Sequence, residues 1–177
     1  MNKTIKLTES GIRSMIAKIL YEANESLNDK VVYRCGDIVN EKDFVDVIWF
    51  SSEPIKHFGE QHSYILRINN PLIVNADGDG WSDKLWWKCC EPNGNPKVSP
   101  DDPKLTSIMP SFLWKIVQET NDEIEYGDIP YIIKKMRDNG KVTYDGVILK
   151  QISETPANNI IVDDYVVFNP KQVKLIK

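Results

Sequence analysis

Four groups of side chains in this chain could form one chemical site: a guanidinium, a pair of hydroxyls, aromatic rings and a carboxylate. Arginine pairs with phosphate, an aromatic ring stacks on a heterocycle, and a carboxylate stabilises positive charge that develops on a sugar. The set therefore suits an anionic, aromatic ligand such as a dinucleotide. Its members are Arg34 with the neighbouring Cys35 and Gly36, the aromatic Trp49 and Phe50, the hydroxyls of Ser51 and Ser52, the ring of Phe58, and the carboxylate of Asp164.

Each of these residues also has an ordinary structural explanation. Arg34 could form an ion pair at a strand end, since arginine is seldom buried without a partner. Ser51 and Ser52, followed by Glu and Pro, have the pattern of a helix cap and turn. Aromatic residues are more often part of a core, and an acidic pair can be a solvated loop end. The residue types alone leave both interpretations open.

The elements that would position these residues are mostly strands. Runs of β-branched and aromatic residues bounded by Gly, Pro or Asn predict strands. The C-terminal end is predicted as a strand that begins at Asp163 and Asp164, a turn at Asn169 and Pro170, and a second strand. A polar loop is expected over 151–162. The other predicted strands are 31–36, 45–52, 63–68, 71–74 and 144–150.

Three segments have helical spacing of apolar residues, at 8–23, 111–120 and 128–137. Helices that do not alternate regularly with strands indicate an α+β layout. Residues 75–110 are rich in Gly, Pro, Asp, Asn and Trp, and are expected to be a long loop or weakly structured insertion. We expect that insertion to be packed, because Trp81, Trp86 and Trp87 need burial.

Composition restricts the class of protein. The 41% hydrophobic and 27% charged content of the 177 residues fits one soluble domain. A net charge of −4 argues against nucleic acid or an anionic membrane as a partner. Three cysteines, two of them adjacent, suit a reducing cytoplasm, and no histidine is spaced with them for a metal site. A thiol enzyme using Cys35 and His57 is an alternative, although no orienting acid accompanies that pair.

Several segments resemble a known family. Residues 47–52, 58–59 and 64–73, with Trp81 after them, resemble the central block of ADP-ribosyltransferase domains found in polyvalent proteins of phages and mobile elements. Residues 144–148 and 165–174 resemble that family's C-terminal block and the end of the poly-ADP-ribose polymerase catalytic domain. The resemblance covers about 31–177, with an insertion at about 75–140, and leaves 1–30 as an N-terminal helix and connector.

The resemblance implies a split β-sheet cleft that holds NAD, with one key residue on each of three strands. Arg34 would orient the nicotinamide ribose or the phosphates, and Trp49 and Phe58 would bracket nicotinamide. The two serines match the serine motif of one branch, and Asp164 stands where the catalytic acid lies. The implied reaction is transfer of ADP-ribose from NAD to an unknown protein acceptor, by a phage or mobile-element effector in the cytoplasm of a host.

The sequence departs from the family at its acid, which is normally glutamate. Aspartate is one methylene shorter, and a misplacement of that order can cost about 100-fold in rate. Asp164 could act with altered geometry, or Asp163 could replace it. Alternatively, the domain could be a catalytically inactive binding or phage structural module.

Overall fold

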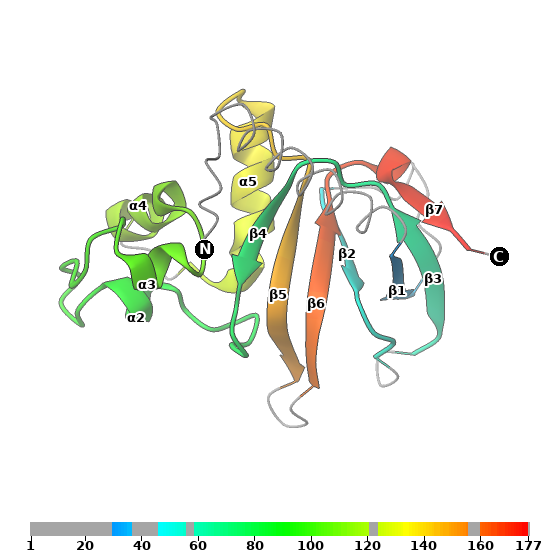
Figure 1. The fold of residues 1–177 in the computed structure, drawn as a ribbon, viewed down its shortest axis with the longest axis horizontal. Helices are drawn as coiled ribbons and strands as arrows, with labels where there is room; N and C mark the ends of the chain where they lie inside the picture. Colours follow the sequence, from blue (N-terminus) through cyan, green and yellow to red (C-terminus); the bar gives the residue numbers. More distant parts are fainter. Residues whose placement is uncertain (1–29, 37–45, 56–58, 121–123, 156–159, 177) are drawn as a thin grey trace, which may run out of the picture.

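The computed structural model describes residues 30–36, 46–55, 59–120, 124–155 and 160–176. The predicted helix at 8–23 and the side chains of His57 and Phe58 lie outside this part of the chain. The described residues form one mixed sheet of seven strands with short helices beside it, which confirms the α+β class (Figure 1). The strand order is β4-β5-β6-β2-β1-β3-β7.

The strands follow the apolar runs of the sequence closely. All five strands predicted before residue 151 are present. Their bounds, with those of the closing strands, are β1 Val31–Cys35, β2 Ile48–Ser51, β3 Gln61–Leu66, β4 Pro71–Asn75, β5 Gly146–Thr155, β6 Ile160–Val167 and β7 Val173–Leu175.

The predicted loop over 151–162 is wrong. β5 continues to Thr155 and β6 begins at Ile160, so the two strands form a long antiparallel hairpin. The ladder between them is irregular at two places, between Leu149 and Ile152 and between Ser153 and Thr155. These irregularities let polar residues interrupt the apolar alternation without ending the strand.

The two closing strands do not pair with each other, contrary to the expected compact strand–turn–strand. β6 lies between β5 and β2, whereas β7 pairs with β3 at the far edge of the sheet. A 3-10 helix, Pro170–Gln172, connects them. The Gln172 side chain fixes this crossover, because its amide donates to the carbonyl of Asp145 at 2.8 Å and its oxygen accepts from the N–H of Phe168 at 3.1 Å.

Two apolar cores lie on opposite faces of the sheet. The larger joins one face of β4, β5 and β6 to the helices, among them α4 (Ser111–Thr120) and α5 (Ile129–Asp138), where helices were predicted. A 3-10 turn, Tyr126–Asp128, precedes α5. The smaller core joins β2, β5 and β6 to β1 and β3. Because alternate residues of a strand point to opposite faces, each central strand contributes to both cores.

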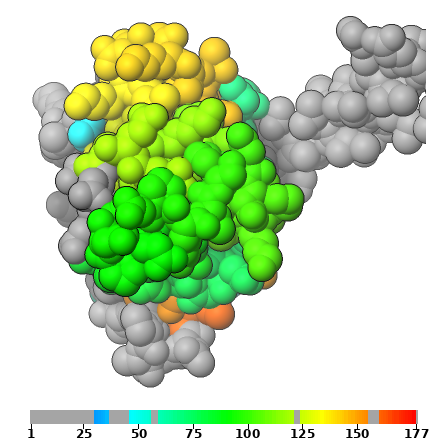
Figure 2. Space-filling model, turned by 90° about the vertical axis from the view of Figure 1, so that its left-hand side faces the viewer, coloured from blue at the N-terminus to red at the C-terminus, as the bar shows by residue number. Residues whose placement is uncertain are grey.

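The segment 75–110 is packed, as expected, and carries the short helices α2 (Trp86–Cys89) and α3 (Pro103–Thr106). With α4 it covers one side of the molecule, with α5 above it (Figure 2). The predicted burial of its tryptophans is wrong for two of them, since Trp87 is 54% exposed and Trp81 is 37% exposed. The Tyr126 hydroxyl donates to Asp79 at 2.9 Å and anchors the segment.

The sheet is weakest between β1 and β2. These strands are paired at a single position, Tyr33 with Ser51, whereas β1 and β3 are paired at five positions. The strands therefore diverge on either side of that pair, and this leaves an opening in the sheet between β1 and β2.

Gly146, at the start of β5, allows close packing against β6 in the β5–β6 hairpin. An added Cβ would lie 2.7 Å from the carbonyl oxygen of Val166 and 3.0 Å from Ile68. The carbonyl belongs to the neighbouring strand and cannot move alone. We predict that Gly146→Ala lowers the free energy of unfolding, measured with urea, by about 1–3 kcal/mol.

Gly127→Ala provides the control, since the nearest atom to its added Cβ is 3.6 Å away. It should change stability by less than about 0.5 kcal/mol. Equal stability of Gly146→Ala and the wild type would contradict the packing described here.

Candidate functional site

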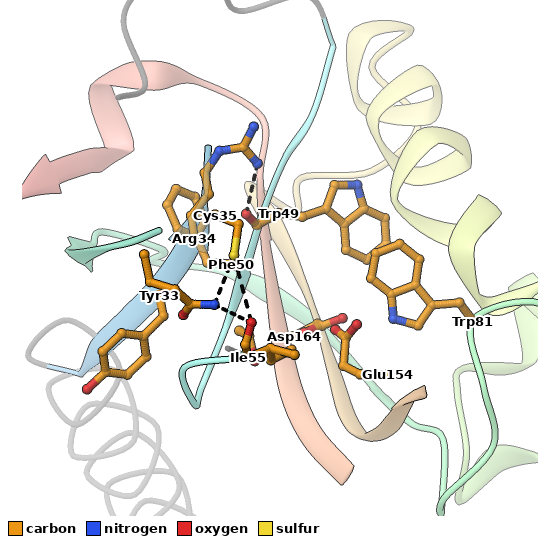
Figure 3. A pocket seen from close by; sticks show the side chains of 11 residues that line it. Tyr33, Arg34, Cys35, Trp49, Phe50, Ile55, Trp81, Glu154 and Asp164 are labelled. Carbon is orange, nitrogen blue, oxygen red and sulfur yellow. Dashed lines mark hydrogen bonds between the residues drawn. The ribbon is translucent and has the colours of Figure 1, made fainter. Parts of the chain in front are cut away.

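An open cavity of about 180 Å³ lies where β1 and β2 diverge. Polar, acidic and aromatic side chains from β1, β2, β5 and β6 meet there (Figure 3). The cavity is lined by Tyr33, Arg34, Cys35, Trp49, Phe50, Ser51, Ile55, Gln61, Trp81, Glu154 and Asp164.

A row of three polar residues crosses the sheet at this cavity. Tyr33 of β1 pairs with Ser51 of β2, and Ser51 pairs with Asp164 of β6. Directly paired residues project from the same face of a sheet. The structure thus brings two predicted site residues, Ser51 and Asp164, side by side from separate strands.

Asp164 lies inside β6, not at its beginning as expected, and is 1% exposed. Its carboxyl group faces that of Glu154 on β5 (Figure 3). Burial, followed by the charge of Glu154 and a hydrogen bond with it, raises the pKa of Asp164 to about 9 from the ordinary 3.8, while a hydrogen bond from Trp81 acts in the opposite direction. At neutral pH Asp164 is therefore a neutral acid.

Arg34 lines the cavity but does not point at the acid pair (Figure 3). Its Nη1 donates to the carbonyl oxygen of Trp49 at 3.2 Å, so the guanidinium bridges β1 and β2 where they part. Its Nε is buried without a hydrogen-bond partner in the described part of the chain. Arg34 therefore links the two strands beside the cavity and keeps one donor unpaired.

Trp49 and Phe50 reach the cavity from opposite faces of β2. The Trp49 ring stacks on Trp81 with centroids 4.6 Å apart, and Phe50 packs edge-on against Tyr64 in the smaller core. Trp49 is thus already stacked on one side by a residue of the insertion. A bracket formed by Trp49 and Phe58 stays a prediction, because Phe58 is outside the described residues.

Cys35 lies at the end of the cavity nearest Gln61, whose amide lies 2.9 Å from the thiol sulfur. The same amide donates to the Ile55 carbonyl at 2.6 Å. These contacts show that Gln61 lies against the thiol. The proposed base of a thiol enzyme, His57, lies outside the described residues.

Three predicted site residues do not line the cavity. Gly36 follows β1 with a φ of 90°, which suits glycine. The hydroxyl of Ser52 accepts from the N–H of Asp163 at 3.0 Å. Asp163 itself, offered as a substitute for Asp164, projects from the other face of β6 and is bound by Lys150 at 2.9 Å. Asp163 therefore does not share the cavity with Asp164.

Five cavity residues were not assigned to the site from the sequence: Tyr33, Ile55, Gln61, Trp81 and Glu154. Glu154 fell in the segment 151–162 that was expected to be a loop, so its position beside Asp164 could not be inferred. The only signal in the sequence was an acid at position 154, between Ile152 and the strand residues 160–162. Using that signal would have required recognising the hairpin. Trp81 was noted as a residue that needed burial and as part of the family resemblance, but not as a site residue.

No metal site or membrane segment is found in the described part of the chain. No group of three or more His, Cys, Asp or Glu residues there could hold a metal ion. None of the described helices is long and apolar enough to cross a membrane.

Comparisons of the chain with protein-family models, with curated proteins and with solved structures find no significant match. The functional argument therefore rests on the cavity and on the sequence resemblance.

The raised pKa of Asp164 has a consequence for stability. The folded protein keeps this proton to a higher pH than the unfolded chain, so the contribution to stability is complete below pH 3.8 and is lost as the pH rises towards about 9. Asp164→Asn removes this loss. We predict that the stability of Asp164→Asn relative to wild type rises across this range, by at most ~1.4 kcal/mol per pH unit.

Asp163→Asn is a matched control with the opposite sign. Burial acts to raise the pKa of Asp163, but hydrogen bonds from Lys150 and the N–H of Gln151 outweigh it and hold that pKa below 3.8. This variant should be less stable than wild type at neutral pH, and the difference should fade in acid. Urea unfolding from pH 2 to 9 measures both, with the fade for Asp163→Asn expected below pH 3.8. Parallel curves for Asp164→Asn and wild type would contradict the assignment.

Proposed function

We propose that this protein is an NAD-dependent ADP-ribosyltransferase that acts on a protein target, as an effector of a phage or mobile element. One observation carries the proposal. Arg34, Ser51 and Asp164, each on a different strand of three neighbours, line one cavity at the place where the sheet opens. This arrangement agrees with the three-strand site that the resemblance implies.

The cavity suits the nicotinamide riboside end of NAD. Arg34, Gln61 and Asp164 line it, and each has a buried polar atom without a hydrogen-bond partner among the described residues. They could bond a carboxamide and ribose hydroxyls, since unpaired buried polar groups are costly. The volume of about 180 Å³ is below the roughly 300–1,000 Å³ of sites for drug-sized ligands, so the adenosine end would lie outside it.

The chemistry needs a weak bond and a stabilised cation. The bond between C1′ of the ribose and the nicotinamide nitrogen breaks, and its electron pair passes to that nitrogen, which neutralises the pyridinium ring. The ribose is left with positive charge, which the acid pair of Asp164 and Glu154 can stabilise with its single negative charge. A nucleophilic atom of the acceptor then bonds C1′, and its proton passes to the carboxylate and on to solvent.

A second candidate is a module that binds its ligand without turnover. The burial of Asp164, which leaves it neutral at pH 7, favours this alternative, because a neutral acid stabilises a cation poorly. Calorimetry separates the two candidates. The module would bind NAD, or a protein partner alone, and release no nicotinamide.

We predict that the purified protein releases nicotinamide from NAD and transfers labelled ADP-ribose to a protein in host lysate. Asp164→Ala should lower the rate of nicotinamide release by about 100-fold or more, because it removes a member of the acid pair. Liquid chromatography of nicotinamide measures the rate, with the melting temperature recorded for each variant.

Asp163→Ala is the control, since its carboxylate points to the other face of β6 and is bound by Lys150. It should keep the rate within about threefold of wild type at pH 7 if it remains folded. Unchanged nicotinamide release by Asp164→Ala would show that this cavity is not the active site.

A further inference from the structure

Two carboxyl groups meet in the cavity, but only one was anticipated. Asp164 projects from β6, and Glu154 projects from β5 beside an irregularity in the ladder. Figure 3 shows their carboxyl ends directed at each other, with the Trp81 indole next to them. Asp164 is 1% exposed, whereas Glu154 is half-buried.

We propose that Glu154 is the carboxylate that contacts the ribose cation, and that Asp164 is its positioning residue, which donates a hydrogen bond to Glu154 from a neutral carboxyl. This inference rests on the proposed function and assigns the roles within the same site. Neither the family resemblance nor the sequence pattern points to Glu154.

Proximity and burial set the division of roles. Two carboxylates in contact cannot both ionise at low cost, so the pair shares one proton near neutral pH. The proton stays on the group that loses more solvation when charged, which is the almost fully buried Asp164. The negative charge then lies on Glu154, which is nearer to solvent.

The other groups around Asp164 agree with this division. From β1, Tyr33 lines the cavity and Arg34 is turned to the Trp49 carbonyl. From β5, Lys150 binds Asp163 on the other face. From the insertion, Trp81 supplies only an indole N–H. Of the charged side chains that act on Asp164, Glu154 has the largest effect, and the charge of Asp163 raises the pKa of Asp164 further.

The same arrangement explains why position 164 can carry aspartate, which is one methylene shorter than the glutamate of the family. A glutamate at 164 would extend one methylene further into the cavity than the aspartate does. Here the longer side chain comes from the neighbouring strand, and Asp164 fills the space behind it. Asparagine at 164 can make the same hydrogen bond through its amide, so it mimics the neutral acid.

Two isosteric variants test the roles by nicotinamide release. Glu154→Gln should lower kcat by about 100-fold or more, because the negative charge at the cation is lost. Asp164→Asn should lower kcat by less than about tenfold, since the donor to Glu154 is kept. A large loss in Asp164→Asn with an active Glu154→Gln would reverse the roles and overturn the proposal.

The pH profile gives a readout that simple misfolding would not. In wild type, kcat should fall on the alkaline side as Asp164, with a pKa of about 9, loses its proton and with it the hydrogen bond that positions Glu154. In Asp164→Asn this alkaline decline should be absent. Its persistence in that variant would show that Asp164 is not the group responsible.

A measurement without NAD separates this inference from the proposed function. In ¹³C NMR of the ligand-free protein, the Glu154 carboxyl carbon should titrate below pH 7 and that of Asp164 above it, assigned with the two variants. The opposite order overturns the proposal even if NAD is cleaved. Absence of NAD binding and cleavage by wild type refutes the proposed function, and with it the catalytic role of Glu154, whatever the order of titration.

Discussion

The site depends on two hydrogen-bonded acids, Asp164 and Glu154, the first of which is almost fully buried in the sheet. Burying two carboxyl groups is expensive unless they share a proton. Asp164 lies beside Ser51 of β2 on one side, and the β5–β6 ladder is interrupted near Glu154 on the other. Strongly perturbed acids in a cleft are typical of functional sites, because core packing alone would favour apolar residues there.

The opening of the sheet supplies access to that pair. β1 pairs with β3 at five positions but with β2 at one, and the Arg34 guanidinium links β1 to the Trp49 carbonyl of β2. Cores on both faces of β2, β5 and β6 hold these strands in place, and with them the buried Asp164. The insertion closes the site with Trp81, which stacks on Trp49.

The sequence predicted those parts of the fold that local pattern controls. Apolar runs located the strands, and Arg34, Ser51 and Asp164, which were grouped from the sequence, line one cavity. The pattern failed where tertiary pairing decides, because the polar residues after Leu149 continue a strand only with β6 beside them. Glu154 was missed for that reason. The exposure of Trp87 could not be predicted either, since it depends on how α2 lies on its neighbours.

The most direct test of the account is an experimental structure of the protein with a non-cleavable NAD analogue. The account predicts the nicotinamide riboside in the cavity between β1 and β2, with a ribose hydroxyl or C1′ next to Glu154 and a polar group of the ligand bonded to Arg34 or Ser51. An analogue bound elsewhere, or a cavity that remains without ligand at saturating concentration, would contradict it.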